Sequence, residues 1–187
     1  MHILTSEFFN RDTHEVAKDL LGKVLYHRKG ENLYRAVISE TEAYHGTEDL
    51  ACHCSKGKTP RTEIMFGEAG YIYIYLIYGM YQMLNFVTMP MDFPAAVLIR
   101  GVKDAVLTKE NNSEIIFQNN QTNGPGKLTQ KLQIGKELNK KLISPVNNLW
   151  VCDNGIYIPE KDIHTGKRIG IDYAKEWRDK AWRFYID

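Results

Sequence analysis

The sequence predicts a single mixed α+β domain that spans residues 1–187. The chain has 187 residues, of which 43% are hydrophobic and 25% charged, values that are ordinary for a globular domain with a sizeable core. Apolar residues recur at helical spacing in some segments and alternate with a period of two in others. No internal repeat and no linker-like stretch divides the chain.

The N-terminal part is predicted to contain one helix followed by a pair of strands. Apolar residues at helical spacing predict an amphipathic helix over 13–21, and Gly22 stands where that helix would end. Residues 23–27 and 33–41 are predicted to form a hairpin around the turn RKGEN. The mostly polar stretch 46–69 is predicted to be a long loop, and loops of this length in compact domains are often functional.

More strands are predicted after this loop. In GYIYIYLIYGMYQMLNFVT, tyrosines alternate with aliphatic residues, and a break at Tyr78-Gly79 separates two apolar runs, which predicts strand, tight turn and strand. The dipeptide Asn154-Gly155 is a strong hairpin signal. The remaining expected elements are a buried strand over 95–102, a helix over 104–120 that fades into an Asn-rich loop, a helix from about Lys127, and a hairpin over 149–158.

Charge and cysteine content restrict the classes of function. Because 24 basic and 23 acidic residues give a net charge of +1, a nucleic-acid face would have to come from segregated charges. The cysteines are odd in number, and the spacing of Cys52 and Cys54 is too short to predict a comfortable disulfide, which favours the reducing cytoplasm. No export signal is visible, and polar residues interrupt the apolar stretch 71–87, so no membrane span is expected.

The stretch SETEAYHGTEDLACH, residues 39–53, concentrates acidic side chains, histidines and a cysteine directly after a predicted strand. A carboxylate beside an aromatic wall is suited to act as a general base, which makes Glu42 next to Tyr44 a candidate. Acidic residues at strand ends are more often simply solvated. If the strand continues to Tyr44, alternation places on one face Tyr34, Ala36, Ile38, Glu40, Glu42 and Tyr44.

Two other chemistries fit the same stretch less well. A zinc site at Cys52, His53 and Cys54 would have suitable ligand types but lacks the CxxC spacing. Glu40 and Glu42 could be the paired carboxylates of a sugar hydrolase, which the spacing permits without specifying.

Three features outside this stretch suit contact with DNA. Tyr78 at the predicted turn would project outward and could wedge between bases, although a plain surface tyrosine is the more common case. GPGKLT fails the phosphate-loop pattern for nucleoside triphosphates, yet Lys127 at a helix start could hold one backbone phosphate. Lys56, Lys58 and Arg61 form a small basic cluster, of a kind that is usually ordinary surface.

Taken together, these stretches resemble the alkyladenine (3-methyladenine) DNA glycosylase family of base excision repair. The resemblance runs from Leu4 to the C-terminus. The motifs that carry it are SETEAYHGTEDLACH, TPR at 59–61, YIYLIYGMYQMLN at 73–85, VLIR at 97–100, GPGKL at 124–128 and RIGIDYAKEWRDKAWRFY at 168–185.

The resemblance implies a role for each matching residue. Glu42 matches the catalytic group that orients and deprotonates the attacking water, and Arg100 matches the arginine that helps to hold this water. The main-chain carbonyl of Ile171 matches the remaining anchor of the water. The aromatic walls around the extruded base match Tyr44, His53 and Tyr75.

The resemblance extends to selectivity and to DNA. Asn85 matches the residue whose bulk disfavours the exocyclic amine of guanine, and Tyr78 matches the side chain that fills the gap left in the duplex. Arg61 and Lys127 are the expected contacts to the DNA backbone.

The resemblance also implies a fold and a reaction. The fold would be an α+β domain on a curved antiparallel sheet with flanking helices, similar to the formyltransferase C-terminal-domain-like fold. The protein would be a cytoplasmic, nucleoid-associated enzyme of bacterial type, a monomer without an obligate protein partner, metal or organic cofactor. It would bind double-stranded DNA containing damaged purines and release 3-methyladenine and 7-methylguanine. Release of hypoxanthine, a neutral base that needs protonation to leave, is the less certain expectation. The competing class is a protein that binds lesions without catalysis. The presence of both Glu42 and Arg100 argues against this class.

Overall fold

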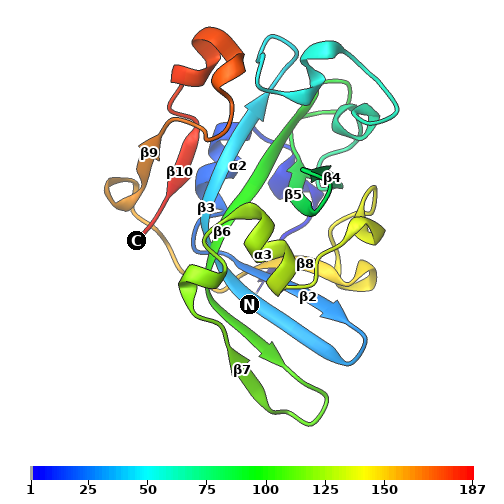
Figure 1. Cartoon of the computed structure of the whole chain (residues 1–187), viewed down its shortest axis with the longest axis vertical. Coiled ribbons are helices and arrows are strands. Elements are labelled where there is room, and N and C mark those ends of the chain that lie inside the picture. The colour runs from blue at the N-terminus through cyan, green and yellow to red at the C-terminus, as the bar shows by residue number, and fades with distance from the viewer. Residues whose placement is uncertain (1) are drawn as a thin grey trace.

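The computed structural model describes residues 2–187 and is built around one antiparallel sheet (Figure 1). Its main path runs β1-β8-β2-β3-β6-β5-β4, while β10 pairs with β3 and β9, and β7 pairs with β6. The strands are β1 (His2–Ile3), β2 (Val24–Lys29), β3 (Asn32–His45), β4 (Ile72–Ile77), β5 (Tyr81–Val87), β6 (Ala95–Thr108), β7 (Glu114–Ile116), β8 (Leu149–Asp153), β9 (His164–Gly166) and β10 (Arg183–Tyr185). The predicted α+β class with an antiparallel sheet is confirmed.

Helices in the described part of the chain are short. The α-helices are α1 (Ser6–Phe9), α2 (Thr13–Asp19) and α3 (Pro125–Lys131). Turns of 3₁₀ helix lie at His53–Lys56, Glu63–Phe66, Asn119–Gln121, Lys136–Leu138, Pro145–Asn147, Glu160–Asp162 and Asp172–Asp179. Within residues 2–187 none of the helices is long and apolar enough to cross a membrane.

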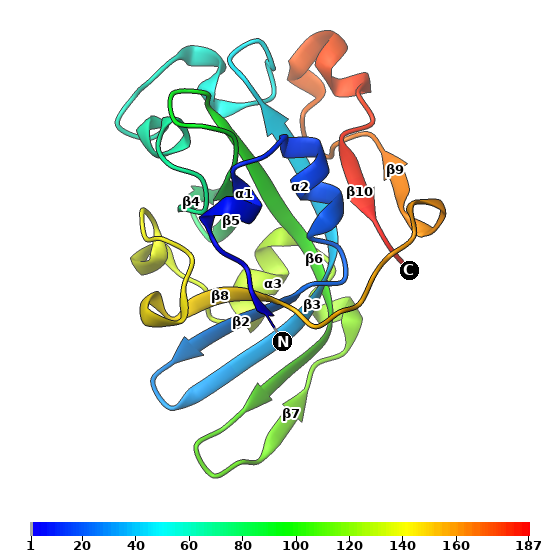
Figure 2. The same ribbon diagram turned by 180° about the vertical axis from the view of Figure 1, so that it is seen from behind.

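The predicted helix near the N-terminus is confirmed as α2, which packs against the back of the sheet (Figure 2). Asp12 caps it, because its carboxylate accepts hydrogen bonds from the backbone N–H groups of His14 and Glu15 at 2.8 and 3.2 Å. The Thr41 hydroxyl of β3 donates to the Ala17 carbonyl at 2.8 Å, which fastens α2 to the sheet.

Both hairpins predicted before residue 90 are confirmed. β2 pairs with β3 from Val24↔Val37 to Lys29↔Asn32, and β4 pairs with β5 from Ile72↔Phe86 to Ile77↔Tyr81. The turn between β4 and β5 holds Tyr78 at φ 53° and Gly79 at φ 70°, the left-handed pair of a tight hairpin turn. Tyr78 is therefore carried on the tip of a two-stranded arm.

The helix predicted over 104–120 is wrong, because β6 continues to Thr108 and pairs with β7. Val106 and Leu107 are buried as strand residues, and Asn112 at φ 60° turns the chain back. The hairpin predicted over 149–158 is also wrong, since β8 pairs with β1 and β2 and not with the residues that follow it.

The expectation that the two neighbouring cysteines are too close for a disulfide is also wrong. Cys52 and Cys54 are joined by a disulfide, with their Cα atoms 5.2 Å apart. That distance lies within the ordinary range for disulfides, because the chain curls as it enters the first 3₁₀ turn. The argument from unpaired cysteines to a reducing compartment therefore does not hold. Cys152 is free and buried.

A bulge in β3 controls which side chains reach the functional face. The register against β6 shifts between Ile38 and Glu40, and shifts again between Glu40 and Thr41. Ile38 lies in the main hydrophobic core, and beyond the bulge Ala43 lies in that same core. The shift therefore moves the core face from even-numbered to odd-numbered positions.

The predicted single face from Tyr34 to Tyr44 is consequently wrong. Tyr34 and Ile38 point into the core, whereas Glu42 and Tyr44 point to the opposite side of the sheet. A regular strand would have placed Glu42 against α2, where no partner for a carboxylate is expected. The bulge instead directs it toward the face that carries the candidate site.

Candidate active site

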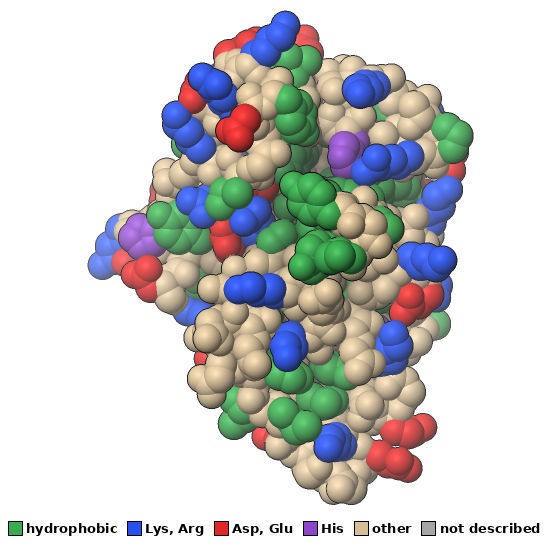
Figure 3. All heavy atoms as spheres, in the orientation of Figure 1, with side chains coloured by type: hydrophobic (Ala, Val, Ile, Leu, Met, Phe, Trp, Pro, Cys, Tyr) green, Lys and Arg blue, Asp and Glu red, His purple; other side chains and the backbone are tan. Residues whose placement is uncertain are grey.

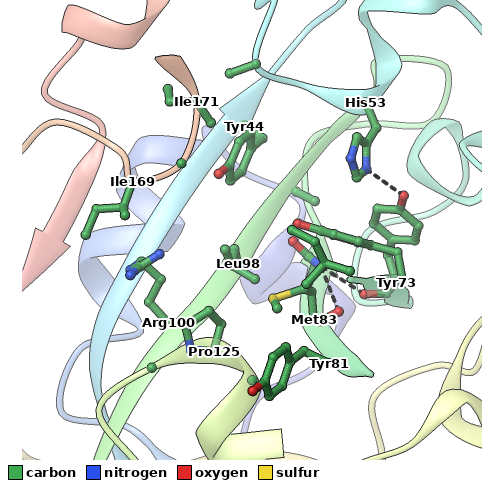
Figure 4. Close-up of a pocket in the computed structure, with 18 of the residues that line it drawn as sticks. Tyr44, His53, Tyr73, Tyr81, Met83, Leu98, Arg100, Pro125, Ile169 and Ile171 are labelled. Atoms are coloured by element: carbon green, nitrogen blue, oxygen red, sulfur yellow. Dashed lines mark hydrogen bonds between the residues drawn. The ribbon is translucent and has the colours of Figure 1, made fainter. Parts of the chain in front are cut away.

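A cavity of about 460 Å³ opens on the face of the sheet opposite α2 (Figure 4). Strands β3 to β6, the start of α3 and the segment 169–173 all contribute to its wall. Hydrophobic side chains gather in the middle of this face, with basic side chains to either side (Figure 3). The cavity is lined by Tyr44, Ala51, His53, Met65, Tyr73, Tyr75, Ile77, Tyr78, Tyr81, Met83, Asn85, Ala96, Leu98, Arg100, Gly124, Pro125, Gly126, Lys127, Ile169, Gly170, Ile171 and Tyr173.

Glu42 lies directly behind this wall with 0% of its surface exposed. Its Oε1 accepts a hydrogen bond from the backbone N–H of Ile169 at 2.8 Å, and its Oε2 accepts one from the Tyr44 hydroxyl at 2.8 Å. The guanidinium Nη1 of Arg100 is 3.5 Å from Oε1. All three partners line the cavity, so the carboxylate lies next to the cavity wall.

Burial is the main influence on the Glu42 carboxyl. It raises the pKa of this group above the ordinary value of 4.5, and the Arg100 charge, the Ile169 N–H and the Tyr44 hydroxyl each oppose the rise. A carboxylate with a raised pKa is a stronger base than a solvated one, which suits proton abstraction near neutral pH.

Glu40 has a different role from Glu42. Its Oε1 accepts hydrogen bonds from Arg100 Nε at 2.9 Å and from Arg183 Nη1 at 3.0 Å. Glu40 thus orients Arg100 toward Glu42 and is itself neutralised by two guanidinium groups. Sequence reasoning gave Glu40 no such role, because Arg183 lies far along the chain on β10.

Aromatic side chains form the opposite wall. The rings of His53 and Tyr75 have centroids 4.5 Å apart and meet edge to face, and Tyr73 packs 5.4 Å from Tyr75. Burial raises the pKa of the Tyr44 hydroxyl well above its ordinary value, so this group stays protonated and can donate to Glu42. The predicted wall residues Tyr44, His53 and Tyr75 are therefore brought together around one cavity.

The histidine in this wall is uncharged at neutral pH. Burial, helped by the charges of Arg61 and Lys56, lowers the pKa of His53 to about 4. Arg61 Nη2 lies 3.5 Å from His53 Nε2, and because a guanidinium only donates, Nε2 accepts. Nδ1 then carries the proton and donates to the Tyr73 hydroxyl oxygen at 2.9 Å (Figure 4).

This lowered pKa makes stability depend on pH. The unfolded chain binds a proton at His53 near pH 6.5, whereas the folded chain does so only near pH 4. We therefore expect His53 to remove stability progressively as the pH falls from about 6.5 to about 4. The measurement is the melting temperature against pH for the wild type and His53→Gln, and the variant should lose less over that window. Equal falls in melting temperature for both proteins over this pH range would contradict the prediction.

Asn85 and Tyr78 occupy contrasting positions. The Asn85 amide donates to the backbone carbonyls of Tyr73 at 3.1 Å and Met83 at 3.0 Å, so its side chain is fixed in the cavity wall. Tyr78 is 83% exposed at the tip of the β4–β5 arm, as predicted. The arm places this ring at the cavity rim.

The remaining predicted site residues lie in the cavity wall or beside it. Ile171 lines the cavity, and its carbonyl accepts the backbone N–H of Ala174 at 2.9 Å. Lys127 lines the cavity from α3, where its ammonium donates to the Asn123 side chain at 2.9 Å. Arg61 lies with its guanidinium carbon 5.3 Å from the Tyr75 ring centroid, which ties it to the aromatic wall.

The zinc site weighed for Cys52, His53 and Cys54 has no support in this geometry. Both sulfurs are taken up by the disulfide, and the His53 ring faces Tyr73 and Arg61. A different group with metal-ligand atoms, Asp12, His14 and His45, has its donor atoms within 4.8 Å of one another. Asp12 in that group already caps α2.

Comparisons with known proteins show the family to which the chain belongs. The model of the family described as methylpurine-DNA glycosylase matches residues 7–187. A protein of Rickettsia felis is 46% identical over 184 residues, which are 98% of this chain and 93% of its own. A protein of Clostridium novyi is 43% identical over 201 residues, covering 100% and 96%. One of Desulfitobacterium hafniense is 40% identical over 208 residues, covering 100% and 96%.

All three relatives carry the name "Putative 3-methyladenine DNA glycosylase". The match to the family model extends over nearly the whole chain. The chain therefore belongs to the methylpurine-DNA glycosylase family, and it is a DNA glycosylase, a hydrolase of N-glycosidic bonds that acts in base excision repair.

Proposed function

We propose that this protein extrudes 3-methyladenine and 7-methylguanine from duplex DNA and hydrolyses their N-glycosidic bonds, leaving an abasic site. The observation that carries the proposal is the buried Glu42 carboxylate, held by Ile169 and Tyr44 directly behind an aromatic cavity. Burying a carboxylate costs folding free energy, so an acidic side chain at this buried position favours a chemical role over a structural one.

The cavity suits an extruded purine. Taking a base out of the duplex costs a few kcal/mol, and less for a damaged pair. Stacking on an aromatic side chain returns about 1 to 3 kcal/mol per contact, so Tyr44, Tyr75 and His53 together would offset extrusion. Electron-rich rings favour a cationic base, which gives alkylated purines an advantage over normal ones.

Hydrolysis would proceed with Glu42 as the general base. The oxygen of a water molecule held near Arg100 and the Ile171 carbonyl attacks C1′ of the deoxyribose, and Glu42 takes its proton. The electron pair of the C1′–N bond leaves with the purine. The Glu42 charge also stabilises the positive charge that develops on the sugar.

Lesions differ in how much help they need. A purine alkylated at N3 or N7 already carries positive charge and leaves as a neutral base. Hypoxanthine is neutral, so it requires protonation on leaving, and we expect it to be released more slowly than the cationic lesions.

Contacts outside the cavity would hold the duplex. Tyr78 is carried at the rim of the cavity with its ring exposed, where it can fill the space left by the extruded nucleotide. Arg61 and Lys127 flank the cavity and would contact backbone phosphates. We propose that the protein acts in this way as a monomer on damaged DNA in the bacterial cytoplasm.

A sugar hydrolase with Glu40 and Glu42 as its acid pair is less well supported. Glu40 is paired with both Arg100 and Arg183, so its carboxylate is occupied by two guanidinium groups and is not free to face a sugar substrate.

The proposal is tested by incubating the purified protein with methylated duplex DNA in the presence of a chelator and identifying the purines set free. We expect 3-methyladenine and 7-methylguanine in solution and alkali-labile abasic sites in the DNA. Binding of the damaged duplex without any release of base would instead identify a lesion-binding protein.

A further inference from the structure

Behind the aromatic wall lies an ion pair that sequence reasoning did not single out. Arg168 and Asp49 are bonded through two contacts, Nη1 to Oδ2 at 2.6 Å and Nη2 to Oδ1 at 2.8 Å, and both side chains have 0% exposure. Neither residue lines the cavity. Removing two charges from water is costly, and a buried ion pair is weak support for stability by itself, so its geometry is the more informative property.

The pair joins three separate segments beside Glu42. Arg168 Nη1 also donates to the carbonyl of Ala43 at 2.9 Å, and Nη2 to the carbonyl of Trp177 at 3.3 Å. Asp49 accepts the backbone N–H of Ala51 at 3.0 Å. The end of β3, the loop that follows it and the C-terminal segment are thus fixed to one guanidinium group.

Two of the three partners of the Glu42 carboxylate are adjacent to this guanidinium. Ile169, whose N–H donates to Glu42, is the next residue after Arg168. The Tyr44 ring, whose hydroxyl donates to Glu42, has its centroid 4.8 Å from the guanidinium carbon of Arg168. On the same guanidinium the Trp182 ring packs at 4.9 Å.

We propose that Arg168 and Asp49 are positioning residues for the glycosylase reaction, which hold the Ile169 N–H and the Tyr44 hydroxyl on the carboxylate of Glu42. This inference rests on the proposed function. Neither residue touches the bound base; they act through Glu42, by fixing its orientation and the hydrogen bonds that favour its ionised form.

The positioning role of Arg168 is tested by a substitution that keeps its charge but removes the planar guanidinium group. Arg168→Lys retains a cation opposite Asp49, but a lysine lacks the planar fork that reaches Asp49, Ala43 and Trp177 together. With the two hydrogen bonds to Glu42 loosened, its ionised form is less favoured. We expect base release to slow about tenfold, while the Kd for lesion DNA changes less than about twofold.

The pH profile separates positioning from a loss of stability. The acid limb of single-turnover base release should move to higher pH by at least about half a unit in Arg168→Lys, because the Ile169 and Tyr44 bonds lower the Glu42 pKa in the wild type. Leu25→Ala serves as the control. Leu25 is a core residue of β2 that contacts neither the pair nor the cavity, so this variant should be less stable with an unmoved limb.

A second variant guards against failure to fold. Asp49→Asn combined with Arg168→Gln removes both charges and leaves the net charge of the pair at zero, and it should show the same upward shift of the acid limb. Should both variants keep the wild-type profile, or shift no more than Leu25→Ala, the positioning role is overturned. If the wild type itself releases no alkylated purine, the proposed function fails first.

Discussion

Glu42→Gln is expected to bind damaged duplex as tightly as the wild type and to lose at least about a hundredfold in base release. General-base assistance is worth roughly 10² to 10⁴ in rate, and an amide cannot take the proton of water. Glutamine keeps the size of the side chain, and its oxygen can still accept the Ile169 N–H. The measurement is single-turnover release of methylated purines beside a binding titration with the same duplex.

The same variant should be more stable at neutral pH. In the folded protein burial raises the Glu42 pKa, so the stability that this group contributes is present below its unfolded pKa of about 4.5 and is lost as the pH rises through the folded value. Glutamine carries no charge and avoids that loss. A higher melting temperature together with lost turnover shows a residue kept for chemistry, whereas near-wild-type turnover would remove Glu42 from its assigned role.

Arg100→Met is expected to give the second large effect, a fall in base release of roughly a hundredfold. Arg100 lines the cavity, and its Nη1 lies 3.5 Å from Glu42 Oε1. Without this cation the Glu42 pKa rises further and the attacking water loses one of its proposed anchors. The variant also leaves a buried carboxylate without its charge partner, which costs about 3 kcal/mol in unfolding free energy.

Arg183→Met provides the matched control for this prediction. Arg183 donates to the same Glu40 oxygen as Arg100. Its backbone pairs with Glu42 between β10 and β3, but its guanidinium bonds to Glu40 and to the Lys167 carbonyl and not to the Glu42 carboxylate, so loss of this side chain should affect base release far less. In a double-mutant cycle, Glu42→Gln should restore part of the stability lost in Arg100→Met, because the uncompensated charge is then gone. Additive changes in stability would show that Arg100 and Glu42 do not interact.

Local patterns were sufficient to predict much of the sheet. The period-two alternation around Tyr73 and Tyr75 and the Tyr78-Gly79 break correspond to β4, β5 and their turn. The helix over 104–120 was wrong because β6 is much longer than its most apolar part, and its second half is stabilised by pairing with β7, a contact that local propensity does not reveal.

The candidate site was only partly predictable for a related reason. Nothing local indicates the bulge after Ile38, which separates Glu42 and Tyr44 from the core face of their own strand. Two of the three partners of Glu42 come from β6 and from the segment that begins at Arg168, far away in sequence. From the residues alone Glu42 was a candidate because Tyr44 stands beside it, while Glu40 stayed open as its partner in a sugar hydrolase. The family resemblance assigned the catalytic role to Glu42, and the arginine pairing of Glu40 gives the physical difference.

The pH dependence of single-turnover release of 7-methylguanine from duplex DNA tests the central role of Glu42 most directly. This cationic base leaves without being protonated, so the acid limb of the profile reports the general base alone. The wild type should show a single acid limb with a midpoint above 4.5, the ordinary value for a glutamate, and Glu42→Gln should be slow with no such limb. A limb that persists unchanged in Glu42→Gln would assign the proton transfer to another group and contradict this mechanism.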